Sequence, residues 1–385
     1  MHLPIPSPND IVASRHRDKA GTGRSRLSGR WILVSAALAV GTLSLDPQTA
    51  ASTPAEAEAL YKVRQTVTLS ALDAAAHDVK WWVSIPDDNP DQEVLDLRVV
   101  SAPGAWKIVR EPENGNRFLY VQATDPGAES LDAVVEFTLR RRGVSVQVDP
   151  DRVGRLDDSQ RNLFARELRL DAPHMEVTEP IRAMADQVCG DETNIGREAA
   201  LLLTEVAQSA DHYSKDPTKP SCGVGDATAC TLNGGGCCTD LHSLFIAMAR
   251  ARGSPARLQM GYRLLAKNVG KEIDPGYRCW AEYFVPGYGW VPADIVEADA
   301  PGGLGMGLWF SGLTVERLWL NQGRELLLDS GDDTRRVNHM SIAYAEVDGV
   351  PARILPEGEL APQITRKIVF DRLAPESMAA LLTAK

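Results

Sequence analysis

The sequence predicts an α+β protein in which a small all-β domain precedes a core of helices packed on a sheet. Between residues 56 and 150, short runs rich in Val, Trp and Tyr are separated by Asp-Asn-Pro and Pro-Gly, a pattern typical of a β-sandwich. After Thr178 the apolar residues recur at helical spacing, and after Gly234 an apolar helical run is followed by alternating strands. The all-β part therefore comes first along the chain and the helical part second.

These patterns divide the chain into four parts: a leader and signal peptide (1–51), an N-terminal β-sandwich domain (52–170), a core (171–300) and a C-terminal extension of the core (301–385). Strands of the sandwich are expected at 61–69, 79–85, 94–100, 118–122, 134–139 and 144–148. Support helices are expected at 180–188 and 195–208, followed by a polar loop at 211–236 and a short final helix from residue 375.

Cys238 is the candidate nucleophile. It follows three glycines (234–236) and lies in the first turn of a predicted helix, in which Leu241, Leu244 and Phe245 recur at helical spacing. A helix N-terminus has free N–H groups and a partial positive charge, which favour a thiolate over a thiol.

The segment after this helix alternates like a strand. Arg278, Trp280 and Glu282 fall on one face, and a turn at 287–289 leads into a second strand that ends near Asp294. A three-residue loop would place Asp294 opposite Glu282 on the Arg278 face, whereas a four-residue loop would reverse the side. In the first register this surface faces the start of the Cys238 helix.

Together these motifs resemble the transglutaminase-like superfamily, whose core is a papain-like thiol fold. The family motif Gly-x-Cys-x-Asp at a helix start is matched by residues 236–240, with Cys238 as the nucleophile and Asp240 as the acidic residue. The family Asp follows Gly-Tyr-Gly-Trp-Val-Pro, which is matched here by Asp294. The similarity covers roughly residues 175 to 350 and includes Tyr-Ala-Glu-Val-Asp-Gly at 344–349, which resembles the tail of exported bacterial members.

The resemblance implies a Cys-bearing helix packed on an antiparallel sheet, with no cofactor and with peptide or protein substrates. It implies that Cys238 and Asp294 are catalytic residues. Asp240, Trp280 and Glu282 are then expected to line or support the cleft.

One position departs from the family pattern. The family's catalytic His lies two residues before the Trp of a Trp-x-Glu motif, and this chain has Arg278 there. A guanidinium stays protonated at any working pH, so Arg278 cannot take a proton from the Cys238 thiol or give one to a leaving amine. It can still stabilise a thiolate by its charge.

Two other histidines are candidates to replace that base. His242 lies four residues after Cys238 on the same helix face, whereas the family's base comes from the facing sheet. We therefore interpret His242 as a polar group satisfied in the core, with a role as the base as the alternative. His339, in a predicted strand, is a second candidate.

The cysteines suggest a disulfide. Five of the six cluster between residues 222 and 279, and in an oxidising compartment such a cluster favours at least one bridge. A Cys222–Cys230 bridge would close the polar loop, and Cys230–Cys237 is the alternative pairing. Zinc is a further alternative, but the spacings match no paired Cys-x-x-Cys pattern, so no metal site is expected.

The N-terminus has the pattern of an export signal. Six Lys and Arg residues precede an apolar run at 31–45, which is too short to span a membrane comfortably, and small residues at 49–51 offer a cleavage site. This predicts a periplasmic or extracellular protein with no membrane span after cleavage. An uncleaved N-terminal anchor helix is the alternative.

The composition is that of a globular protein with an acidic surface. The chain has 385 residues, of which 44% are hydrophobic, enough for two domains with their own cores. The net charge is -11, and it becomes -14 without residues 1–51, because they hold six basic and three acidic side chains. This balance argues against a nucleic-acid partner.

Two functional hypotheses follow. In the first, Cys238 attacks a glutaminyl or peptide carbonyl, and water or an amine releases the acyl group, as in an acyltransferase or amidase. In the second, the chain keeps the cleft as a module that binds peptides or proteins with little or no turnover. Arg278 at the position of the base favours the second hypothesis.

Overall fold

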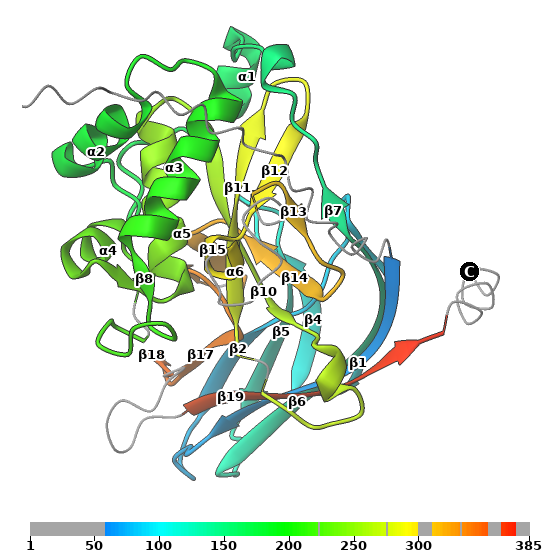
Figure 1. The fold of residues 1–385 in the computed structure, drawn as a ribbon. Helices are drawn as coiled ribbons and strands as arrows, with labels where there is room; N and C mark the ends of the chain where they lie inside the picture. Colours follow the sequence, from blue (N-terminus) through cyan, green and yellow to red (C-terminus); the bar gives the residue numbers. More distant parts are fainter. Residues whose placement is uncertain are drawn as a thin grey trace, which may run out of the picture. The chain divides into compact units, whose positions relative to one another are not determined.

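The structure is a computed structural model that describes residues 58–221, 224–274, 276–298, 310–331, 333–352 and 363–374. Ala51–Lys385 forms one compact unit, shown in Figure 1. The expected signal peptide, Cys222 and the expected final helix from residue 375 lie outside the described residues.

The all-β domain consists of two antiparallel sheets, as the sequence predicts. Their strand orders are β19-β1-β6-β3 and β18-β17-β2-β5-β4. The strands are β1 (Glu58–Ser70), β2 (Asp78–Ser84), β3 (Gln92–Ser101), β4 (Ala105–Arg110), β5 (Arg117–Thr124), β6 (Ser130–Arg142), β17 (Ala343–Val347), β18 (Val350–Pro351) and β19 (Gln363–Leu373).

The last three of these strands come from the segment 301–385, which the sequence pattern assigns to the core. β19 pairs along its whole length with β1, from Leu60 opposite Leu373 to Ser70 opposite Gln363. The C-terminal segment therefore adds strands to both sheets of the N-terminal sandwich. No local pattern predicts this pairing, because a strand's partner is selected by packing between segments far apart in sequence.

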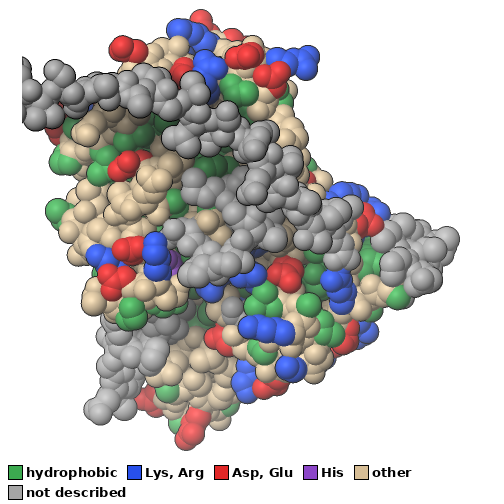
Figure 2. Space-filling model, viewed as in Figure 1, with side chains coloured by type: hydrophobic (Ala, Val, Ile, Leu, Met, Phe, Trp, Pro, Cys, Tyr) green, Lys and Arg blue, Asp and Glu red, His purple; other side chains and the backbone are tan. Residues whose placement is uncertain are grey.

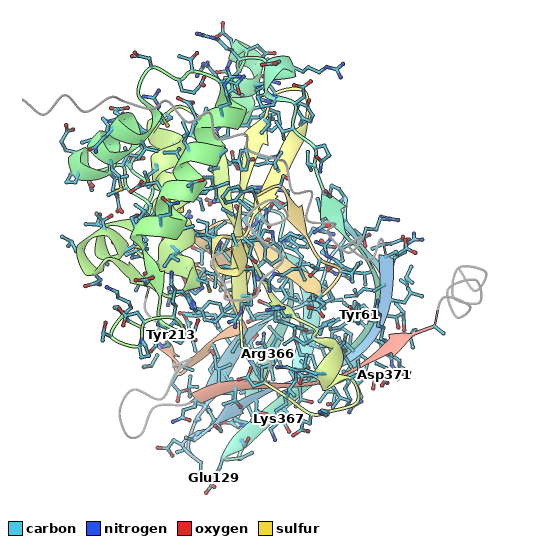
Figure 3. All side chains as sticks on the ribbon, viewed as in Figure 1. Tyr61, Glu129, Tyr213, Arg366, Lys367 and Asp371 are labelled. Atoms are coloured by element: carbon cyan, nitrogen blue, oxygen red, sulfur yellow. The ribbon has the colours of Figure 1, made fainter. Side chains whose placement is uncertain are left out.

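Side chains along β19 alternate between the interior and solvent. Arg366 is buried with its guanidinium carbon 4.5 Å from the centre of the Tyr262 ring, whereas the next residue, Lys367, is exposed and pairs with Glu272. Figure 3 shows Arg366 and Lys367 on opposite sides of the strand. This period of two is the one expected for a half-buried strand.

The second sheet of the sandwich is covered on both faces. Trp81 and Trp82 are consecutive on β2, so their side chains point to opposite faces, yet both are buried. Trp82 packs against Leu326 and Leu328 of a hairpin formed by β15 (Leu326–Asp329) and β16 (Thr334–Val337).

The core places helices against an antiparallel sheet of order β12-β11-β10-β14, and Figure 1 shows α2 to α5 gathered on one side of that sheet. All residues of α5 except the last are buried, so its polar side chains must find partners inside the protein. The elements are α1 (Asp158–Leu163), α2 (Glu179–Cys189), α3 (Ile195–Ser209), α4 (Ala227–Asn233), α5 (Cys238–Ala251), α6 (Ile295–Ala298), β10 (Ala256–Arg263), β11 (Arg278–Val285), β12 (Gly289–Ala293) and β14 (Arg317–Gln322).

The segment 211–236, expected to be a loop, contains regular structure. Helix α4 lies in its second half, where the Asp226 side chain accepts a hydrogen bond from the Ala229 N–H (2.8 Å) and Gly234 ends the helix with φ of 60°. The remaining short elements of the chain are β7 (Val144–Ser145), β8 (Asp211–His212), β9 (Gly235–Gly236), β13 (Gly312–Leu313), η1 (Pro150–Arg152) and η2 (Ala266–Asn268).

The register between β11 and β12 differs from the predicted one by two residues. Val285 pairs with Gly289 and Ala281 with Ala293, so Asp294 is in line with Trp280 rather than Glu282. The pair nearest the turn is Val285 with Gly289, and Pro286 lies in the turn, because proline has no N–H to donate to a neighbouring strand. A shift of two residues leaves Asp294 on the predicted face.

Charged side chains of both signs are interspersed on the face shown in Figure 2, with scattered hydrophobic residues between them. Within the described ranges, no helix has both the length and the apolar character needed to cross a membrane.

Candidate active site

Helix α5 begins at Cys238, after a tight glycine turn. Gly235 has φ of 140°, and a Cβ there would lie 2.0 Å from the Asp211 carbonyl oxygen, so a side chain is excluded. The Asp240 carboxylate in the first helical turn accepts the Cys237 N–H at 2.8 Å. The glycines and Asp240 therefore define where the helix starts and hold Cys238 there.

The Cys238 thiol is buried beside two other thiols, those of Cys237 and Cys279. Cys237 lowers the pKa of Cys238, but Cys279 and burial raise it, and the net result is a raised pKa. A helix N-terminus favours the thiolate, but the surroundings of Cys238 favour the thiol. At neutral pH Cys238 is a protonated thiol.

Arg278 lies at the edge of this thiol cluster, half-buried at the start of β11. Its charge lowers the pKa of Cys238, although less than the other influences do. One terminal nitrogen donates to the Tyr277 carbonyl at 3.1 Å, and the buried Nε has no hydrogen-bond partner within the described part of the chain. Arg278 thus supplies positive charge and no proton acceptor.

Asp294 is buried and forms an ion pair with Arg317 on β14, which is equally buried. Arg317 also contacts Glu297, with a nitrogen-to-oxygen distance of 3.1 Å. Across the described residues, no hydrogen bond or ion pair joins Asp294 to Arg278. The strand pattern places the two on one face, but the structure gives Asp294 a different cationic partner.

His242 is fully buried between α5 and α6, with both ring nitrogens occupied. Its Nδ1 lies 2.7 Å from the Cys238 carbonyl oxygen, and its Nε2 lies 3.1 Å from the Ile295 N–H. A carbonyl only accepts and a backbone N–H only donates, so these partners assign the proton to Nδ1 and the lone pair to Nε2. Burial lowers the pKa of His242, although Asp294 opposes this. His242 is therefore a neutral group without a free lone pair, and it ties the two helices together.

Two more histidines lie near this region. Burial first, and then the charge of Arg278, lower the pKa of His212 to about 4; its Nδ1 is 2.7 Å from the Ser214 hydroxyl. The His339 ring lies 6.2 Å from the Tyr277 ring, outside any strand, and burial lowers its pKa to about 3. Within the described chain, neither has a hydrogen bond to Cys238.

Trp280 and Glu282 anchor β11 to its surroundings. Trp280 packs in a small apolar cluster with Leu313 and Trp319. Glu282 pairs with Arg257 on the neighbouring strand β10, with oxygen-to-nitrogen distances of 2.7 and 2.8 Å. These contacts position the strand that bears Arg278 and Cys279.

With this geometry in place, comparison with known proteins gives a consistent assignment. Residues 182–295 match the model of the Transglutaminase-like superfamily. This segment, which holds Cys238, Arg278 and Asp294, is therefore similar to that superfamily.

One sequence relative and two solved structures are similar to this chain. An uncharacterized protein of Haemophilus influenzae is 25% identical over 341 residues, which cover 76% of this chain and 87% of the relative. A crystal structure of a candidate cysteine protease from Cytophaga hutchinsonii aligns with a TM-score of 0.50 and 15% identity, covering 82% of this chain and 99% of that one. The periplasmic domain of TgpA from Pseudomonas aeruginosa aligns with a TM-score of 0.31 and 18% identity, covering 66% and 93%.

The cysteines of the transglutaminase-like domain do not form the alternative bridge considered above. Cys230 and Cys237 are both free, buried thiols, so that pairing is not formed, and the Cys222 pairing lies outside the described residues. Burial raises the pKa of Cys230 to about 12. Among the described residues, no group of three or more His, Cys, Asp or Glu side chains is arranged to hold a metal ion.

Sequence patterns alone miss two neighbours of the site. Arg317 is 23 residues from Asp294 in sequence, on a strand with no motif that marks it. Cys279 lies next to Arg278 but points to the other face, where its sulfur is 3.4 Å from His242 Nδ1. Strand alternation assigns Cys279 to that face, but the contact itself requires the packing of α5 on β11.

The buried Asp294–Arg317 ion pair predicts a loss of stability when its cation is removed. Replacing Arg317→Met leaves the Asp294 carboxylate buried without its cation, and we expect the free energy of unfolding to fall by about 3–5 kcal/mol. The double variant Asp294→Asn/Arg317→Met should lose less, because no buried charge is left unpaired. Urea unfolding followed by circular dichroism measures both, and a single variant that is no less stable than the double variant would contradict the prediction.

The raised pKa of Cys238 predicts slow alkylation of its thiol at neutral pH. The thiolate is the reactive species, so iodoacetamide labelling of Cys238 should be slow at neutral pH and should still be rising at about pH 9, beyond the ordinary thiol pKa. Peptide mass spectrometry on non-reduced protein measures the rate, with urea-unfolded protein as the reference. A Cys238→Ser variant separates the signal of Cys237. Fast labelling that levels off below about pH 7 would mean a stabilised thiolate.

Proposed function

We propose that the transglutaminase-like domain is catalytically impaired and uses its cleft to bind peptide or protein segments, within an exported protein. The observation that carries the proposal is that Arg278 occupies the position that the sequence resemblance gives to the family's catalytic His, two residues before Trp280, and a guanidinium cannot accept a proton.

The surroundings of Cys238 support this proposal. Its pKa is raised, so it needs a base to become a nucleophile. His242 has no free lone pair, since the Ile295 N–H occupies its Nε2. Asp294, which would orient a catalytic His, is instead paired with Arg317. Each group that a thiol mechanism requires is therefore absent or engaged elsewhere among the described residues.

One observation favours an active thiol acyltransferase or amidase as the second candidate. Cys238 is the first residue of α5, where backbone N–H groups can stabilise both a thiolate and the oxyanion of a tetrahedral intermediate. The positive charge of Arg278 also lowers the pKa of Cys238. Such a site would act on glutaminyl or peptide bonds through a Cys238 acyl-enzyme.

Restoring the base distinguishes the two candidates. We expect the wild type to turn over glutaminyl and peptide substrates no faster than Cys238→Ser does, while binding a fluorescent glutaminyl peptide saturably. Arg278→His should gain turnover of about 100-fold or more, the usual contribution of a general base. Release of ammonia or amine measures turnover, and fluorescence anisotropy measures binding.

The matched controls are Arg278→Gln, which removes the charge without adding a base, and Arg278→His/Cys238→Ser, which adds a base without the thiol. Neither should gain activity. Wild-type turnover that requires Cys238 would overturn the proposal in favour of the active enzyme. An inert Arg278→His would show that more than this one residue has been lost.

Export rests on the basic leader and the apolar run at 31–45. We expect the mature protein recovered from the periplasm or medium of a bacterial host to begin near residue 52, as N-terminal sequencing or intact mass would show. Protein that keeps residues 1–51 and sediments with membranes would instead support an N-terminal anchor. A chain without residues 1–51 serves as the control and should remain in the cytosol.

A further inference from the structure

A charged cavity of about 370 Å³ lies at the other end of helix α5 from Cys238. Its wall includes Arg250 on α5, the segment around Arg166 and Arg169 after α1, and Asn114 from the loop between β4 and β5. Arg250 comes twelve residues after Cys238, a distance of about 18 Å at 1.5 Å per helical residue. The Arg250 side of the pocket is therefore distant from Cys238, whereas Arg324 on another wall bonds Ser243 in the first half of α5. The volume of the pocket suits a small ligand.

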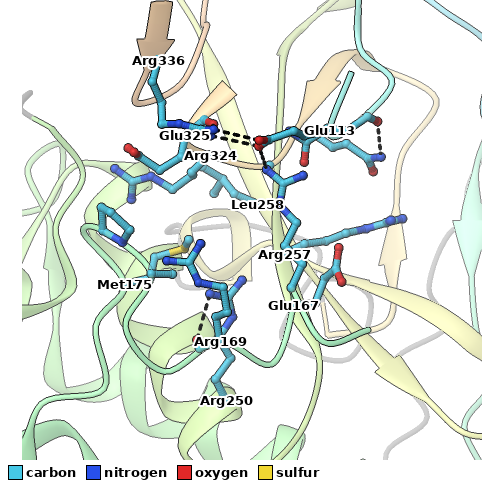
Figure 4. Close-up of a pocket in the computed structure, with 16 residues that line it drawn as sticks. Glu113, Glu167, Arg169, Met175, Arg250, Arg257, Leu258, Arg324, Glu325 and Arg336 are labelled. Carbon is cyan, nitrogen blue, oxygen red and sulfur yellow. Dashed lines mark hydrogen bonds and ion pairs between the residues drawn. The ribbon is translucent and has the colours of Figure 1, made fainter. Parts of the chain in front are cut away.

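The lining of the pocket carries an excess of positive charge. It contains six arginines and three glutamates, in a chain whose net charge is -11. Figure 4 shows these side chains around the hollow, with Glu113 bridging to Arg336 at its upper edge. Two of the arginines form ion pairs with carboxylates outside the lining. Arg257 pairs with Glu282, and Arg169 pairs with the exposed Asp171.

Two of the arginines are buried and have no carboxylate partner. Arg250 donates only to carbonyl oxygens, two bonds to Ala256 at 2.8 and 3.2 Å and one to Arg169 at 3.3 Å. Arg324 donates to carbonyl, hydroxyl and amide oxygens, and neither forms an ion pair within the described residues. Burial lowers the pKa of each to about 10. A buried charge without a counter-charge is costly, and an anion nearby would reduce that cost.

The pocket also has unused hydrogen-bond donors. A guanidinium has five N–H groups; Arg324 uses all of its own, but Arg250 uses three, and Arg166 and Arg169 each use one, with Glu113 and Asp171 respectively. The amide nitrogen of Asn114 is buried without a hydrogen-bond partner in the described chain. Several donors and few free acceptors therefore meet at one cavity.

We propose that this pocket binds a compact oxyanion, a carboxylate or a phosphate group, held by Arg166, Arg169 and Arg250. Planar guanidinium groups bind both anions through paired charge-assisted hydrogen bonds. The floor is rigid, because Arg250 is held by the backbone of both flanking segments. The anion would supply the direct ion pair that Arg250 lacks. Glu167, also in the lining, raises the pKa of Arg250 by its charge, so a bound anion would have to tolerate this carboxylate nearby.

The test uses the full chain and two anions, orthophosphate and succinate, each titrated at constant ionic strength with potassium chloride. Thermal unfolding and isothermal calorimetry are followed for the wild type, Arg166→Gln/Arg169→Gln and Arg64→Gln/Arg98→Gln. The last variant is the matched control, because it also removes two partly exposed arginines, both of which pair with Glu136 on the sandwich.

We expect a saturable rise in Tm for the wild type and the control with at least one anion, and binding weaker by about tenfold or more in the pocket variant. A response to phosphate alone identifies a phosphate ligand, and a response to succinate alone identifies a carboxylate. No saturable binding of either anion to the wild type, or equal binding by the pocket variant, overturns the proposal. If circular dichroism shows that the double variant is unfolded, the single variant Arg169→Gln tests the proposal in its place. Among the described residues, the Arg169 side chain pairs with the exposed Asp171 alone, so its loss should leave the fold intact.

Discussion

The buried ion pair between Asp294 and Arg317 connects the parts of the structure that surround Cys238. It joins the start of α6 to strand β14, and both side chains are almost completely removed from solvent. His242 adds the third element, since it bonds both the Cys238 carbonyl and the Ile295 N–H. Two charges in the interior are tolerated only as a pair, so the Cys238 helix, α6 and the sheet are held in one arrangement.

That arrangement determines the chemistry available to Cys238. In a thiol enzyme an acidic residue orients a histidine, and the histidine exchanges protons with the thiol. Here Asp294 is engaged by Arg317, and the Cys238 thiol is buried with Cys237 and Cys279. Arg278, which the proposed function puts at the position of the family's histidine, contributes positive charge and no proton acceptor. The proposed binding of peptide or protein segments needs no proton transfer at this site.

Arginine has different roles at different places in this chain. Arg317 neutralises a buried carboxylate and Arg278 supplies charge beside a thiol. Arg250 and Arg324 are buried against carbonyl and other neutral oxygens, and among the described residues neither forms an ion pair. Both line the cavity at the C-terminal half of α5. Because hydrogen bonds to neutral oxygens satisfy donors without neutralising charge, these residues mark the pocket as a site for an anion.

The sequence alone determined the features that depend on local pattern. The α+β class, the start of a buried helix at Cys238 and the strand that bears Arg278 follow from spacing and side-chain chemistry. Helical and strand periods are properties of neighbouring residues, and the protonation of Arg278 does not depend on its surroundings.

Only the tertiary structure decided which partners meet. The pairing of β19 with β1, the choice of Arg317 as the partner of Asp294, the contact between Cys279 and His242, and the raised pKa of Cys238 all join segments distant in sequence. A helix start favours the thiolate in isolation, but the neighbouring Cys279 thiol on β11 and burial by other elements raise the pKa of Cys238. Partner choice and burial arise when elements pack, so no local pattern in the chain contains them.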